Sequence, residues 1–213
     1  MYTFWGYFRS SAAYRVRIAF NLKQIAHDKR FVHLARGEQS EQDFKRINPQ
    51  GLVPVLQIED GGTHHTLIQS LAILEYLEEV HPEPALLPAD PLDRARVRAI
   101  ADIVACDIHP INNLRVLNYL KGPMHQKDDA MRAWYAHWVD SGFEAVEEMV
   151  GRDGFCFGDS PTMADVCLIP QIFNARRFEV DLYPFPKIRR IEENCGKIEA
   201  FAQAHPDRQP DAA

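Results

Sequence analysis

The sequence predicts an α/β domain followed by an all-helical domain, and three observations support this division. In residues 1–81, segments in which apolar and polar residues alternate are interspersed with segments in which apolar residues recur every three or four positions. Residues 82–91 (PEPALLPADP) contain four prolines and are predicted to form a linker, because proline removes a backbone donor and disfavours helix in the residue before it. In residues 92–213 only the helical period remains.

The elements of residues 1–81 follow the order strand–helix–strand and then strand–strand–helix. The strands are predicted at YTFWGY, KRFVHL, VPVLQIED and HHTLI, and a Gly61-Gly62 turn joins the last two. Helices are predicted at residues 11–23 and 70–81, with a shorter polar one at 41–46. This order suggests a small α/β sheet with a right-handed crossover, and it is the order of the thioredoxin-like fold.

The helical domain is predicted to begin with one long helix. Its apolar residues step by three or four: Val97, Ile100, Val104, Ile108, Ile111 and Leu114. Pro110 predicts a kink in this helix. Further helices are predicted at residues 128–150, 163–178 and 187–204. Thr162 and Asp165 have the spacing of a capping box, which we interpret as a folding signal and not as part of a catalytic site.

The composition excludes several classes of protein. The chain has 24 basic and 30 acidic residues, a net charge of −6 that argues against a nucleic-acid partner. It has no apolar run long enough to span a membrane and no signal-peptide pattern at residue 1. The four cysteines are scattered, without metal-ligand spacing. We therefore expect a cytoplasmic protein with reduced thiols and no metal site, membrane partner or nucleic-acid partner.

The junction of the first strand and the first helix carries Arg9-Ser10-Ser11-Ala12. A thioredoxin-like redox protein has C-x-x-C there, so thiol chemistry at this site would need a thiol supplied by a ligand. Serine is also a preferred helix cap, and on these residues alone a plain cap is an equally good interpretation. In the second interpretation, a hydroxyl and the helix N-terminus hold the sulfur of the ligand as a thiolate.

Two further segments suggest a peptide-like ligand. In NPQGLVPVL, Pro54 at the entry to a strand predicts a bend, plausibly a cis peptide, which would leave the Val53 backbone free to pair with an extended peptide. The alternative is an ordinary edge-strand proline. In LIQSLAILEYLEE, Gln69 and Ser70 precede a helix, whose N-terminus can bind a carboxylate. Here the alternative is a plain serine cap.

Over nearly its whole length, the chain resembles the zeta class of glutathione transferases, which includes maleylacetoacetate isomerase and maleylpyruvate isomerase. The class motif is similar to S-S-C-x-W-R-V-R-I-A-L, and residues 10–20 read SSAAYRVRIAF. Other similar segments are NPQGLVPVL, LIQSLAILEYLEE, LLPADP, CDIHPINNLRVLNYL and ARRFEVDLYPFP. Ala12 departs from the motif, which has Cys at this position, so no cysteine can contribute there.

The resemblance implies that glutathione is the cofactor and that matched residues bind it. Ser10 would face the glutathione sulfur, with Ser11 beside it. Val53 would pair with the backbone of the tripeptide, and Gln69 and Ser70 would hold its γ-glutamyl carboxylate and amine.

Four other matched residues are implied around the same site. His109 and Asn112 would reach it from the helical domain, although a His before a kinking proline is equally often a structural cap. Arg9 and Arg177 would bind an anionic substrate. On the residues alone, Arg177 would instead be interpreted as an exposed cation at a helix end.

The resemblance implies a glutathione-dependent cis–trans isomerase of a conjugated dicarboxylate. The expected reaction is maleylacetoacetate to fumarylacetoacetate in the catabolism of aromatic compounds. The alternatives are a maleylpyruvate isomerase, a general glutathione transferase, and a non-catalytic binding module of the same fold, against which the presence of Ser10 argues. The resemblance also implies a homodimer.

Overall fold

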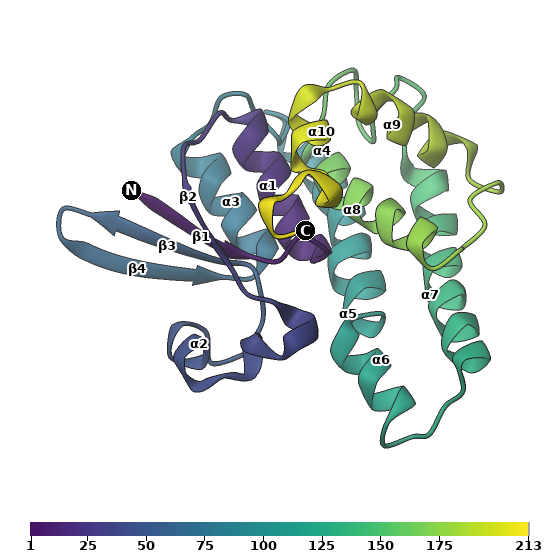
Figure 1. Cartoon of the computed structure of the whole chain (residues 1–213). Coiled ribbons are helices and arrows are strands. Elements are labelled where there is room, and N and C mark those ends of the chain that lie inside the picture. Colours follow the sequence, from purple (N-terminus) through teal and green to yellow (C-terminus); the bar gives the residue numbers. More distant parts are fainter. Residues whose placement is uncertain (213) are drawn as a thin grey trace. The chain divides into compact units, whose positions relative to one another are not determined.

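The computed structural model describes residues 1–212 and divides them between two units (Figure 1). The first unit contains Met1–Ala85 together with the chain from Ile198 onward, and the second contains Leu86–Lys197. The predicted fold class, an α/β thioredoxin-like part and an all-helical part, is confirmed.

The first unit is built on one four-stranded mixed sheet. Its strands are β1 (Tyr2–Gly6), β2 (Asp28–Phe31), β3 (Val55–Asp60) and β4 (Thr63–Ile68), in the order β2-β1-β3-β4. The β1–β2 pair is parallel and the other two pairs are antiparallel. Trp5 lies opposite Val55, and Val55 lies opposite Ile68. The chain therefore leaves β1, enters β3 and leaves β4 at the same end of the sheet.

The helices of this unit are α1 (Ser11–Leu22), α2 (Gln42–Ile47), α3 (Ser70–Val80) and α10 (Glu199–Ala204). Short 3₁₀ turns occupy Leu34–Arg36, Glu38–Ser40, Pro206–Arg208 and Pro210–Ala212. Helix α1 packs against both α3 and α10. Its apolar residues Val16 and Ile18 are fully buried, as are Ile73 and Leu77 of α3. The predicted apolar faces thus form the core of the unit.

A buried ion pair connects the C-terminal ends of α1 and α3. Lys23 Nζ lies 2.7 Å from Glu78 Oε2, and the Lys23 side chain is fully buried. The same nitrogen donates to the carbonyl oxygens of His81, at 2.6 Å, and Pro84, at 2.8 Å. These extra hydrogen bonds offset the loss of hydration that makes a buried charge costly. They also fasten the beginning of the predicted linker to the first unit.

The units differ from the predicted division into residues 1–81, 82–91 and 92–213. The boundary falls inside the proline-rich segment, between Ala85 and Leu86, and Leu86 is buried with its carbonyl accepting from the Met163 N–H at 2.8 Å. At the other end, the chain from Ile198 onward belongs to the first unit, because α10 packs on α1. Periodicity identified α10 as helical but carries no information about which helix it packs against.

The second unit is all-helical in its described residues. It contains α4 (Pro91–Asp102), a π-helical segment (Ile103–Ile108), α5 (His109–Ile111), α6 (Leu114–Lys121), α7 (Asp128–Met149), α8 (Met163–Arg177) and α9 (Pro186–Gly196). Its core is formed by fully buried aliphatic and aromatic residues that include Val97, Val104, Val139, Phe143, Ile172 and Ile188.

Two helix predictions were wrong in their extent. The helix predicted through residues 97–114 remains helical past Pro110 to Ile111 and then breaks at Asn112 and Asn113. A π-helical segment precedes Pro110, which has no N–H to donate to the preceding turn, and Asn113 begins a new helix by accepting from the Arg115 N–H at 3.1 Å. The helix predicted at residues 187–204 is two helices, because Ile198 is extended (φ −92°, ψ 121°) and separates α9 from α10.

The capping box predicted before α8 is present. The Asp165 carboxylate accepts from the N–H groups of Thr162 and Cys156, each at 2.8 Å, and Asp165 is fully buried. Burial raises the pKa of this carboxyl, which these hydrogen bonds oppose. All these contacts join neighbouring turns of the second unit, in agreement with the interpretation as a folding signal.

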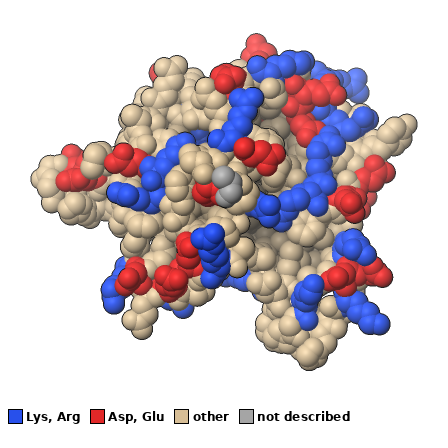
Figure 2. Space-filling model, in the orientation of Figure 1, with Lys and Arg blue, Asp and Glu red and all other residues tan. Residues whose placement is uncertain are grey.

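Charged side chains of both signs are interspersed on the face drawn in Figure 2. Several form ion pairs three residues apart on one helix, such as Arg46–Asp43 and Arg96–Asp93. Such exposed pairs contribute little to stability, because water screens them and two long side chains must be ordered.

Replacing Glu147 with alanine should lower the free energy of unfolding by about 1–2 kcal/mol, because this carboxylate caps α9. Its Oε1 accepts from the Lys187 N–H at 2.8 Å, and its Oε2 accepts from the Ile188 N–H at 2.9 Å. Urea denaturation would measure the change. The control is Glu148, an exposed residue that follows Glu147 on α7. Equal losses of stability from Glu147→Ala and Glu148→Ala would contradict the capping role.

Candidate active site

Ser10 begins α1 as its N-cap. Its Oγ accepts from the Ala13 N–H at 3.2 Å, and its own N–H donates to the Tyr7 carbonyl at 3.0 Å. The cap uses a lone pair of the oxygen, so the hydroxyl proton remains available to a ligand. Ser11, the first residue of the helix, is buried, and Arg9 is exposed with its guanidinium 4.9 Å from the centre of the Phe8 ring. Ser10 is therefore both a cap and a donor beside a helix N-terminus.

The second element of the site precedes β3. The Val53–Pro54 peptide is cis, as predicted. Val53 lies outside the sheet, and within residues 1–212 its N–H and C=O make no hydrogen bond. A free backbone donor and acceptor on one residue can pair with the backbone of a peptide ligand.

The third element is the N-terminus of α3. Gln69 precedes it with φ +71°, a conformation that residues other than glycine rarely adopt, and such outliers concentrate at functional sites. Among the described residues, no side chain caps this helix end. Ser70 is buried and accepts from Arg15 Nη1 at 3.1 Å, while Gln69 Nε2 donates to Gln50 Oε1 at 2.8 Å. The first turn is thus suited to an anion.

The sheet brings these three elements together. Ser10 follows β1, Val53 precedes β3 and Gln69 follows β4, and the register places all three at one end of the sheet. One ligand can therefore meet the Ser10 hydroxyl, the unpaired backbone groups of Val53 and the uncapped N-terminus of α3. That combination suits a short peptide with a thiol and a carboxylate.

The second unit groups two other predicted residues around a stacked aromatic pair. The rings of Tyr135 and Phe178 stack with centres 3.8 Å apart. Asn112 Nδ2 donates to the Tyr135 carbonyl at 3.3 Å, and the Arg177 guanidinium lies 4.9 Å from the centre of the Phe178 ring. Burial raises the pKa of Tyr135 to about 12, although the Arg177 charge opposes this. Asn112 and Arg177 thus contact the two residues of one stacked pair, Asn112 through the Tyr135 backbone and Arg177 through the Phe178 ring.

His109 is the first residue of α5. Its Nε2 is 3.5 Å from Nδ2 of Asn113, the residue that caps α6. This position agrees with the alternative interpretation of His109 as part of the broken backbone around Pro110.

Two residues that contact predicted site residues were not identified from the sequence. Arg15 and Tyr135 look like ordinary helix positions there, because nothing local marks an arginine as buried or a tyrosine as stacked. Arg15 is 1% exposed. Among residues 1–212, no group of His, Cys, Asp and Glu gathers as a metal site.

The chain belongs to the glutathione S-transferase family. Residues 9–80 match the N-terminal domain of glutathione S-transferases, and residues 128–193 match the C-terminal domain. Zeta-class members are among its relatives, in agreement with the resemblance stated above.

Relatives with curated names lie at just under half identity over the full chain. Maleylpyruvate isomerase of a Ralstonia species is 48% identical over 100% of this chain and 99% of its own length. Maleylacetoacetate isomerase of Pseudomonas aeruginosa is 49% identical over 96% of each chain.

Solved structures of similar proteins have the same fold. A zeta-class maleylpyruvate isomerase has a TM-score of 0.94 and 47% identity, with 99% of this chain and 100% of that chain covered. Maleylacetoacetate isomerase of Anaeromyxobacter dehalogenans has a TM-score of 0.92 and 45% identity, with 100% and 98% covered, and it has glutathione bound in its active site. In the described part of the present chain, no helix is long and apolar enough to cross a membrane.

Proposed function

We propose that this protein is a glutathione-dependent cis–trans isomerase that converts maleylacetoacetate to fumarylacetoacetate. The observation that carries the proposal is the convergence of Ser10, Val53 and the α3 N-terminus at one end of the sheet, without a cysteine at the thiol position. Two of the relatives described above are named as isomerases, and their similarity to this chain supports the same class of reaction here.

The residues of the first unit fit glutathione. The uncapped first turn of α3, with Gln69 and Ser70, would hold the γ-glutamyl carboxylate and amine. The unpaired backbone of Val53 would bind the cysteinyl residue of the tripeptide. When bound, glutathione supplies a thiolate that adds reversibly to a conjugated cis double bond, so that the remaining single bond can rotate before the thiol is eliminated.

Ser10 would hold the sulfur in its charged form by donating its hydroxyl proton. Lowering a thiol pKa by two units needs about 2.7 kcal/mol. A hydrogen bond to a charged group supplies about 1.5–3 kcal/mol, and a helix N-terminus adds about 0.3–1 kcal/mol. The two together are sufficient, so the site needs no separate general base. Ser11 is the adjacent candidate for the same role.

Four residues would serve the second substrate and the outer part of the site. Arg9 and Arg177 would each bind a carboxylate, for which the planar arginine fork is well suited. Their charges would also stabilise the enolate that forms when the double bond is attacked. Asn112 and His109 would reach the outer part of the site from the helical domain.

A maleylpyruvate isomerase is the second candidate, because relatives of that name match over the whole chain. The two reactions use the same thiolate and differ in the length of the substrate. A general transferase acting on apolar electrophiles would have no use for Arg9 and Arg177 as carboxylate ligands. We further propose that the protein is a cytoplasmic homodimer, in which the α/β domain of one chain packs on the helical domain of the other.

Assays of the purified protein with glutathione should distinguish these functions. We expect isomerisation of maleylacetoacetate with a kcat/KM at least about tenfold above that for maleylpyruvate, because roughly 1.4 kcal/mol of pocket contacts is enough for that preference. Conjugation of a chloronitrobenzene should be slow. The reverse order of the two isomer substrates would support the maleylpyruvate reaction, and rapid conjugation alone would reject both isomerases.

A further inference from the structure

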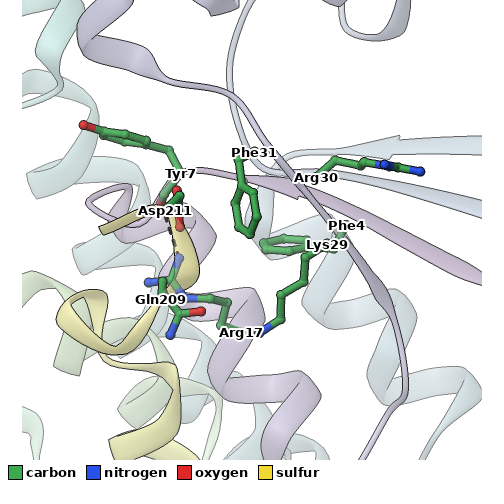
Figure 3. Close-up of a pocket in the computed structure, with 9 residues that line it drawn as sticks. Phe4, Tyr7, Arg17, Lys29, Arg30, Phe31, Gln209 and Asp211 are labelled. Carbon is green, nitrogen blue, oxygen red and sulfur yellow. Dashed lines mark hydrogen bonds between the residues drawn. The ribbon is translucent and has the colours of Figure 1, made fainter. Parts of the chain in front are cut away.

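The chain after α10 folds back onto the loop that carries the thiol-site serine. Gln209, which is buried, holds the turn by donating from Nε2 to the carbonyls of Gln203, at 2.8 Å, and His205, at 3.0 Å. We call residues 205–212 the C-terminal strap. Figure 3 shows Gln209 and Asp211 of the strap beside Arg17 of α1, in a small pocket that Tyr7, Phe4 and Phe31 also line.

The strap and α1 hold both sides of one peptide residue, Phe8. The Phe8 N–H donates to Asp211 Oδ2 at 2.8 Å, and the Phe8 carbonyl accepts from Arg17 Nη2 at 3.0 Å. Phe8 is two residues before Ser10, and the Tyr7 carbonyl accepts from both Arg17 Nη1, at 3.3 Å, and the Ser10 N–H, at 3.0 Å. The backbone that leads to Ser10 is therefore fixed by two side chains from outside the loop.

Arg17 connects this loop to the end of α10, the helix that leads into the strap. It is 5% exposed, and its Nε donates to the Ala204 carbonyl, at 3.0 Å, at the C-terminus of α10. Burial lowers the pKa of Arg17 to about 10, while the charge of Asp211 opposes that shift. Arg17 is thus still a cation at neutral pH, and Asp211 supplies a negative charge to its surroundings. Asp211 of the strap and Arg17 of α1 therefore each hold the Phe8 backbone through one hydrogen bond.

We propose that Asp211 is a positioning residue for the thiol site: it holds the Phe8 peptide so that Ser10 caps α1 with its hydroxyl proton directed to the glutathione sulfur. The inference rests on the proposed function of Ser10. Removing the Asp211 carboxylate frees the Phe8 N–H and takes away a negative charge that acts on Arg17, so the loop samples other conformations. Ser10 then spends less time in the geometry that stabilises a thiolate.

The test compares Asp211→Ala and Asp211→Asn with the control Asp207→Ala, an exposed residue of the same strap. One measurement is the amide hydrogen exchange of Phe8 and Ser10 in the protein without glutathione. The other is the absorbance titration of the thiolate in the glutathione complex. We expect Asp211→Ala to speed exchange at both amides and to raise the thiol pKa by about half to one unit, the loss of part of one charged hydrogen bond. Asp211→Asn, which keeps an acceptor oxygen, should change both less.

The outcomes separate this inference from the proposed function. Unchanged exchange in Asp211→Ala would overturn the inference, and so would faster exchange with an unchanged thiol pKa while Ser10→Ala shifts that pKa. In the second case the strap is only structural. Faster exchange in Asp211→Ala, combined with no effect of Ser10→Ala on the thiol pKa, would instead support positioning of the loop and reject the role of Ser10. Asp207→Ala should match the wild type in every measurement.

Discussion

Replacing Ser10 with alanine is expected to raise the pKa of the thiol of bound glutathione by about one to two units, the loss of one hydrogen bond to a charged sulfur. If the bound thiol has a pKa of about 6.5, this rise lowers the thiolate fraction at pH 7 from about three quarters to between about a quarter and a few per cent, so kcat/KM should fall about 3- to 25-fold. Glutathione affinity should change little, because Val53 and the α3 N-terminus bind the rest of the tripeptide. Titration of the thiolate absorbance and calorimetry of glutathione binding would measure the two effects separately.

Ser11→Ala is the matched control. Ser11 lies within the first turn of α1, whereas Ser10 is the N-cap whose oxygen already accepts from the Ala13 N–H. We expect Ser11→Ala to leave the titration midpoint near that of the wild type. A large shift in Ser11→Ala with none in Ser10→Ala would transfer the role to Ser11. Both substitutions remove a hydroxyl, so a thermal unfolding measurement should accompany them to account for loss of the cap.

Replacing Arg177 with alanine is expected to lower kcat/KM for the dicarboxylate substrate at least about tenfold, because an arginine–carboxylate hydrogen bond contributes about 1.5–3 kcal/mol. Glutathione affinity should be unchanged. The guanidinium lies over the Phe178 ring, which stacks on Tyr135. Steady-state kinetics with varied dicarboxylate would measure the effect.

Arg176→Ala is the control for this prediction, and the structure explains why. Arg176 pairs with Glu192 through two hydrogen bonds, from Nε and from Nη2, so its charge is already engaged within the second unit. Its loss should cost about 0–1 kcal/mol of stability and leave kcat/KM near the wild-type value. Equal, small effects on kcat/KM from Arg176→Ala and Arg177→Ala would reject carboxylate binding by Arg177 and favour the general transferase.

Local sequence patterns predicted most elements of the fold. The apolar–polar alternation in YTFWGY and the apolar residues of α1 that recur every three or four positions each lie within one short segment. That segment therefore contains the whole signal for the element. The capping box of α8 and the turn at Gly61-Gly62 have the same local origin. The predictions that were wrong in extent, at residues 97–114 and 187–204, concern interruptions that a periodic pattern continues through.

The candidate thiol site was predictable for a similar reason, since Ser10, Val53-Pro54 and Gln69-Ser70 each lie where an element begins or ends. The sequence placed all three segments in one domain, whereas their convergence at one end of the sheet follows from the register of the strands. The positive φ of Gln69 was not predictable, because no glycine marks it and only the entry into α3 requires it.

By itself, the sequence determined the type and order of the elements and the residues at their ends, because helix periods, caps and prolines act within a few residues. The tertiary structure alone decided which buried polar groups meet. Arg15 reaches Ser70 across 55 residues, and Asp211 accepts from the Phe8 N–H across 203. No local pattern encodes such contacts, because a buried charge is placed wherever the packed chain offers it hydrogen-bonding partners. For that reason the loop that carries Ser10 was evident in the sequence, whereas the strap that holds it became visible only in the fold.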